Sequence, residues 1–153
     1  MQLRPVLARF DRIASLLQSP LLLIIRLYWG YAFMQSGWGK LMNLDRTAGF
    51  FETLHIPVPK LNAIMAGSTE CFGGVLLMLG LFARAATVPL TFCMLVAYAT
   101  ADREALLGIF SAPDKFLGAD PFLFLFAAVI VLAFGPGRIS LDALFFRKPA
   151  VPA

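Results

Sequence analysis

Residues 61–82 read LNAIMAGSTECFGGVLLMLGLF, and this stretch decides the class of the protein. Glu70 is its only charged residue, and its length is enough for a helix to cross a bilayer. A carboxyl group near the middle of such a helix must be paired, neutral or functional to be tolerated in hydrocarbon. The stretch therefore predicts a membrane helix in which Glu70 needs an explanation.

Three more apolar blocks accompany this one, at residues 20–42, 85–101 and 121–134. With 59% hydrophobic and 14% charged residues, the composition is that of an integral membrane protein. We therefore predict an all-α fold, a bundle of four transmembrane helices. The last two blocks would span roughly 20–26 Å, less than a hydrocarbon core of about 30 Å, so we expect local thinning of the bilayer or extension into the flanking loops.

The segments around these blocks also carry patterns. Residues 1–19 have apolar residues at helical spacing with arginines between them, which predicts an amphipathic helix on the inner leaflet. Residues 44–59 predict a short interfacial helix between the first two spans, ended by a pair of prolines. The longest connection, residues 102–120, is a candidate lid, with Asp120 and Pro121 expected to cap the last span. The membrane domain is expected at 20–146 and a short tail at 147–153.

Apart from Arg26, the basic residues divide seven to five between the two sides of the predicted bundle. The richer side carries both termini, so we expect both termini in the cytoplasm. The net charge of +4 then has a topological explanation and indicates no nucleic-acid partner. The first apolar block reaches spanning length without a small-residue cleavage site, so no cleavable signal peptide is expected.

Arg26 is the partner that we expect for Glu70. It lies inside the first span, and both residues fall on faces rich in small side chains that let two helices approach closely. The face of the first span comprises Arg26, Gly30, Phe33, Gly37 and Lys40, and that of the second includes Gly67, Glu70, Gly73 and Gly74. An Arg26–Glu70 pair has two interpretations, a buried ion pair that fixes helix register or a proton-handling or ligand-binding pair.

Other chemistry has little support in the sequence. His55, the single histidine, has no Cys, Asp or Glu at ligand spacing, so we expect no metal site. Cys71 and Cys93 form no Cys-x-x-Cys motif and are expected to be small buried hydrophobes. Trp38 and Lys40 lie near the outer end of the first span, where side chains of these types anchor helices at the membrane interface.

The C-terminal stretch 135–142, GPGRISLD, ends the last span with a turn. Ser140 is expected to cap a short helix after it, and Arg138 is within reach of Asp142. Arg84 falls on the same side of the membrane. An anionic headgroup or a partner protein could dock at these charges.

Three patterns in this order resemble the DoxX family of small bacterial membrane proteins, over roughly residues 20–146. They are Arg26-x3-Gly30-x2-Phe33-x3-Gly37-x2-Lys40, then Glu70-x2-Gly73-Gly74-x5-Gly80-Leu81-x2-Arg84, and finally Gly135-Pro136-Gly137-Arg138-x-Ser140-Leu141-Asp142. The resemblance implies a four-span bundle in the bacterial inner membrane. The family takes its name from a subunit associated with a thiosulfate:quinone oxidoreductase, and other members are linked to thiol and oxidative-stress complexes.

We therefore expect the membrane subunit or anchor of a quinone- or thiol-linked redox complex with soluble or membrane partners. Whether the chain is itself an enzyme, and whether it forms a homo-oligomer, stays open. The alternatives are a non-enzymatic scaffold or assembly factor and a small-solute transporter. Glu70 and Arg26 are the catalytic candidates. A quinone would contact Arg26, Trp29, Phe33, Lys40 and Glu70. The positions expected to serve helix packing or docking are Gly30, Gly37, Gly73, Gly74, Arg84, Arg138 and Asp142.

Overall fold

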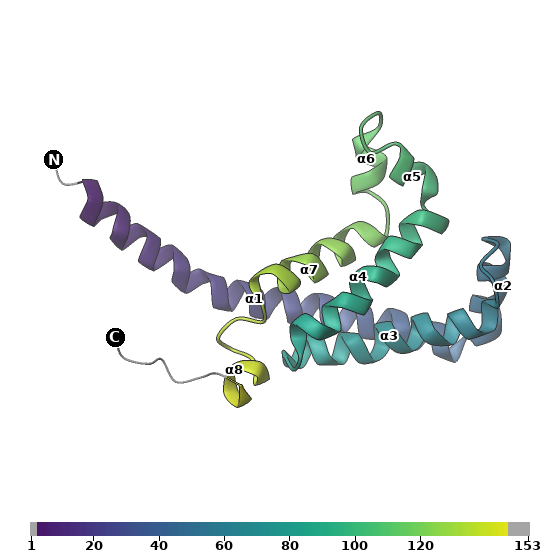
Figure 1. The fold of residues 1–153 in the computed structure, drawn as a ribbon, viewed down its shortest axis with the longest axis horizontal. Coiled ribbons are helices and arrows are strands. Elements are labelled where there is room, and N and C mark those ends of the chain that lie inside the picture. The colour runs from purple at the N-terminus through teal and green to yellow at the C-terminus, as the bar shows by residue number, and fades with distance from the viewer. Residues whose placement is uncertain (1–2, 147–153) are drawn as a thin grey trace.

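The computed structural model describes the backbone of residues 3–146 and the side chains of residues 14–146. Every regular element in this range is a helix, as the sequence predicts (Figure 1). The helices are α1 (Leu3–Met42), α2 (Leu44–Thr53), α3 (Pro59–Leu79), α4 (Ala83–Thr100), α5 (Arg103–Leu107), α6 (Pro113–Leu117), α7 (Pro121–Phe134) and α8 (Leu141–Phe145).

Within the described residues, three helices are long and apolar enough to cross a membrane: the Ala14–Met42 part of α1, together with α3 and α4. The fourth predicted span is α7, an apolar helix of 14 residues. At 1.5 Å per residue it is about 21 Å long, shorter than a bilayer core. The all-helical membrane class is confirmed, and length alone supports three of the four predicted spans.

Helix α1 is continuous from Leu3 to Met42, with Pro20 inside it. A boundary was expected at residue 20, yet the backbone continues as one helix through it, and its N-terminal part extends away from the other helices (Figure 1). The side chains of residues 1–13 lie outside the described residues, as does the predicted tail 147–153. The amphipathic face of the N-terminal segment and its place on the inner leaflet therefore stay predictions.

Glycines let α1 and α3 pack with their backbones in contact. A Cβ atom on Gly74 would lie 2.5 Å from the carbonyl oxygen of Gly30, and one on Gly37 would lie 2.5 Å from that of Gly67. Side chains larger than hydrogen do not fit at such distances. The predicted small-residue faces are confirmed, and they set an antiparallel register with Gly30 opposite Gly74 and Gly37 opposite Gly67.

A tight turn joins α3 to α4. Gly80 ends α3 in the left-handed conformation, with φ of +64°, and the Leu81 N–H donates to the Leu76 carbonyl at 3.0 Å. This is the hydrogen-bond pattern by which glycine commonly ends a helix. Helix α7 then packs beside α4, and a core forms between α1, α3, α4 and α7 from Phe33, Leu77, Ala83, Leu90, Met94, Ala128 and Val131.

The short helices α2, α5 and α6 lie at the end of the bundle away from Gly80 (Figure 1). Helix α2 confirms the predicted short helix between the first two spans. The connection that holds α5 and α6 is attached to α4, because the Tyr98 hydroxyl donates to the Phe116 carbonyl at 2.7 Å. At the start of α7, Pro121 occupies the first turn as predicted, whereas Asp120 makes no side-chain capping bond, contrary to expectation.

Candidate functional site

Glu70 lies buried in α3 and is bound by two side chains of α1. The Lys40 ammonium forms a salt bridge with its Oε2 atom, and the Ser36 hydroxyl donates to the same oxygen at 2.9 Å. Lys40 also donates to Ser36 Oγ at 2.8 Å, which closes the triangle. Ser36 and Lys40 are four positions apart and so share one face of the helix. The charge of Glu70 is therefore both neutralised and hydrogen-bonded.

Helix α4 adds a thiol to this group. Cys93 is half-buried, packs against the apolar core, and lies close enough to Thr69, Glu70 and Lys40 to interact with them electrostatically. We call Ser36, Lys40, Thr69, Glu70 and Cys93 the polar cluster. It brings a thiol, a carboxylate, an ammonium and two hydroxyls to the meeting point of α1, α3 and α4.

The predicted pairing of Arg26 with Glu70 is wrong. Arg26 is fully buried, its Nη2 atom donates to the Ile139 carbonyl, and its Nε and Nη1 atoms have no hydrogen-bond partner. The reason is helix register: the glycine contacts place Glu70 opposite Ser36, which is about 15 Å farther along α1 than Arg26. An arginine side chain does not cover that distance.

Arg26 instead packs against the end of α3. Its guanidinium group lies so close to Gly80 that a Cβ atom there would overlap with Nη1. A cation beside the C-terminus of a helix is stabilised by the partial negative charge of that end. Asp142 adds a second favourable interaction, because its carboxylate attracts the Arg26 guanidinium electrostatically.

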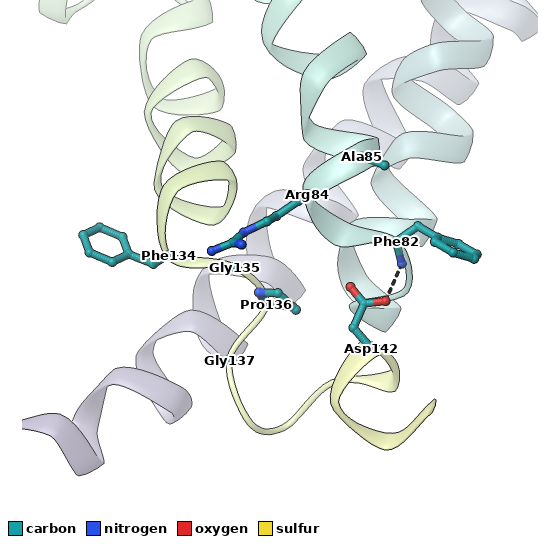
Figure 2. A pocket seen from close by; sticks show the side chains of 8 residues that line it. All are labelled: Phe82, Arg84, Ala85, Phe134, Gly135, Pro136, Gly137 and Asp142. Carbon is teal, nitrogen blue, oxygen red and sulfur yellow. Dashed lines mark hydrogen bonds between the residues drawn. The ribbon is translucent and has the colours of Figure 1, made fainter. Parts of the chain in front are cut away.

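Asp142 belongs to residues 135–146, which fold back across this end of the bundle and which we call the strap. Its two carboxylate oxygens accept the backbone N–H groups of Phe82, at 2.7 Å, and Ala83, at 2.9 Å (Figure 2). Its own N–H donates to the Gly80 carbonyl at 2.8 Å. The strap thus caps the N-terminus of α4 and covers the end of α3.

Two predictions about the strap have opposite outcomes. Ser140 caps α8 as expected, since its Oγ accepts the Ala143 N–H at 3.1 Å. The expected contact between Arg138 and Asp142 is wrong: among the described side chains their charged groups form no ion pair. Arg138 is exposed and is held through its backbone, whose N–H donates to Ser19 Oγ at 3.1 Å.

Arg84 lies at the same end, in the first turn of α4. Its Nη2 atom donates to the Ala133 carbonyl at 3.1 Å. The side chain borders a surface hollow of about 550 Å³ (Figure 2), lined by Phe82, Arg84, Ala85, Phe134, Gly135, Pro136, Gly137 and Asp142. Arg84 and Asp142 therefore share one surface, as the sequence suggests.

The five residues named for a quinone do not gather at one place. Lys40 and Glu70 lie together in the polar cluster. Trp29 and Phe33 instead contact the ring of Phe124 in α7, with centroids 5.0 and 4.8 Å apart. Arg26 lies under the strap. A quinone site therefore stays a proposal, and any such site includes only part of the predicted set.

Sequence reasoning missed three members of the polar cluster. Ser36 was passed over although it lies one turn from Lys40, and Lys40 was expected at the membrane interface and at a quinone site but not as the partner of Glu70. Thr69 was passed over although it neighbours Glu70 in the chain. Cys71 is a small buried residue, as expected, and Cys93 packs against the apolar core as a half-buried residue within electrostatic range of Glu70 and Lys40. The sequence signal that could have identified these residues is the spacing of polar side chains on helix faces that also carry glycines.

Comparison with known proteins agrees with the fold. The DoxX family profile matches residues 21–103, more than half of the chain. An uncharacterized membrane protein of Mycobacterium tuberculosis is 34% identical over 141 residues, covering 84% of this chain and 83% of that protein. No solved structure matches the chain. The chain belongs to the DoxX family of membrane proteins.

Proposed function

We propose that this protein is the membrane subunit or anchor of a thiol- or quinone-linked redox complex with soluble partners. The observation that supports this best is the position of Cys93, whose thiol lies with Thr69, Glu70 and Lys40 in the polar cluster. The thiolate is the reactive form of cysteine, and a nearby cation stabilises it. Lys40 supplies that cation, and its salt bridge with Glu70 holds it in the polar cluster.

The proposed setting is the bacterial cytoplasmic membrane, crossed four times. Helix α7 supplies the fourth span, since it is apolar throughout and packs antiparallel to α4, with Arg84 against Ala133. Local thinning of the bilayer compensates for its short length. Both termini then face the cytoplasm, in keeping with the greater number of basic residues on that side.

The thiol chemistry can be tested by alkylation. A membrane-permeant maleimide should label Cys93 faster in Glu70→Gln than in the wild type, because the variant removes a negative charge that opposes thiolate formation and leaves the Lys40 cation in place. Cys71→Ala serves as the background, so that a single cysteine reports. An unchanged rate of labelling in Glu70→Gln would show that the charges of the polar cluster do not act on the thiol, which would contradict the proposal.

The redox role needs a second measurement, on the complex that co-purifies with the chain. Ubiquinone reduction driven by a thiol donor should be lost in Cys93→Ser and kept in the matched control Cys71→Ala. Equal activity in both variants would contradict a role for Cys93.

A scaffold or assembly factor is the second candidate, favoured by the closed triangle of Ser36, Lys40 and Glu70. A buried ion pair can serve to fix helix register. In that case Glu70→Gln lowers the melting temperature in detergent, while the redox activity of the co-purified complex per folded molecule stays at the wild-type level.

A further inference from the structure

The hollow beside Arg84 lies where α4 begins and α7 ends. Gly135 is what allows the Arg84 side chain to lie across the end of α7, because a Cβ atom there would stand 3.3 Å from Arg84 Nε, and its φ of +77° favours glycine (Figure 2). Phe82 and Phe134 point outward on either side (Figure 2) and are 55% and 63% exposed. A cationic group thus lies between two exposed aromatic rings.

The charges at the hollow are not balanced. Asp142 is occupied, because both its oxygens accept N–H groups of α4 and its carboxylate also attracts the buried Arg26. Arg84 has a backbone carbonyl, that of Ala133, as its partner, and its side chain is exposed. The described side chains at this end of the bundle therefore include three guanidinium groups, those of Arg26, Arg84 and Arg138, and one committed carboxylate, and Arg84 presents positive charge at the hollow itself.

An apolar surface continues from the hollow along α4. Val88 and Phe92 follow Ala85 at helical spacing and are 56% and 66% exposed. Since α4 is apolar and long enough to span a membrane, this surface faces lipid chains, and Arg84 lies at the headgroup level. A ligand with an anionic head and apolar tails matches both parts.

We propose that the hollow binds the headgroup of an anionic phospholipid, with its phosphate on the Arg84 guanidinium and its acyl chains along Ala85, Val88 and Phe92. A guanidinium can donate two parallel hydrogen bonds to a phosphate, which gives the contact both strength and orientation. This site is independent of the redox role proposed for the polar cluster.

The purified full-length protein in detergent provides the test. Phosphatidylglycerol and phosphatidylcholine with identical acyl chains are added separately, and the melting temperature is measured with each. We expect a larger upward shift with phosphatidylglycerol. This difference should disappear in Arg84→Gln and persist in Arg103→Gln, which changes an exposed arginine at the opposite end of the bundle.

A second variant guards against loss of folding in the first. Ala85→Glu leaves the Arg84 side chain in place and adds a carboxylate to the hollow, and it too should abolish the difference between the lipids. A difference that survives in both variants would overturn the proposal. Equal shifts from the two lipids in the wild type would also overturn it and favour an acidic protein segment as the occupant, and an equal shift from glycerol 3-phosphate would favour a free phosphate.

Discussion

Glu70 and Arg26 are both buried and ionisable, yet the protein treats them differently. Glu70 has two side-chain partners from α1, one of them the opposite charge of Lys40. Arg26 has a backbone carbonyl as its partner, two donor atoms without one, and a carboxylate that attracts it without forming an ion pair. The charge of Glu70 is thus neutralised by direct contact inside the α1–α3 interface. The charge of Arg26 is instead stabilised by the C-terminus of α3 and by the strap.

The largest effect is expected from Lys40→Met. This change leaves the Glu70 carboxylate buried with Ser36 as its remaining partner, and removing one member of a buried pair costs about 3–5 kcal/mol. The free energy of unfolding in detergent, measured at pH 7, should fall by this amount. A loss below about 1 kcal/mol would mean that Lys40 is solvated and contributes little to the pair.

Arg26→Met should have a smaller effect. The variant loses the charged hydrogen bond to the Ile139 carbonyl, worth about 1.5–3 kcal/mol, but it also removes two buried donors that have no partner. We expect a net loss of about 1–2 kcal/mol by the same unfolding measurement. A loss as large as that of Lys40→Met would show that the two charges are held in the same way after all.

Asp142→Ala should cost about 1 kcal/mol, the usual value for removing a helix N-cap. The N-terminus of α4 loses both carboxylate contacts, and the strap loses its attachment to Phe82 and Ala83. Limited proteolysis should therefore cut residues 135–146 faster than in the wild type. Matched cleavage rates would show that Arg26 and Ser19 hold the strap without Asp142.

Lys60→Met should have the smallest effect. Lys60 pairs with Asp45 at 3.1 Å, but the two side chains are 65% and 92% exposed. Exposed pairs contribute less than about 1 kcal/mol, and salt screens them. The free energy of unfolding should hardly change, and the small change should shrink further at high salt. This variant is therefore the surface control for Lys40→Met.

Much of the fold follows from the sequence alone. Apolar length predicts α1, α3 and α4, and residues 44–59 predict a short helix, although α2 ends at Thr53, before the proline pair that was expected to close it. The glycine faces also predict which sides of α1 and α3 meet. These features are determined by residues close together in the chain, so hydrophobic periodicity and turn residues are enough to predict them.

The pairing of the charges does not follow from the sequence, because it depends on the register between α1 and α3. Both Arg26 and Lys40 share the inward face with Gly30 and Gly37, so sequence spacing allows either as the partner of Glu70. The contacts of Gly30 with Gly74 and of Gly37 with Gly67 set how α1 is shifted along α3. This register brings Lys40, rather than Arg26, to Glu70. The bond from Arg26 to Ile139 joins residues 113 positions apart, a distance at which local patterns carry no signal.

Two double-mutant cycles in the same detergent decide which residue is the partner of Glu70. One combines Lys40→Met with Glu70→Gln, and the other combines Arg26→Met with Glu70→Gln. Contacting residues couple by about 0.5–3 kcal/mol, whereas distant ones add within about 0.5 kcal/mol. We predict a coupling above about 1.5 kcal/mol for Lys40 and none beyond about 0.5 kcal/mol for Arg26. A stronger coupling of Glu70 to Arg26 than to Lys40 would contradict the arrangement of charges described above.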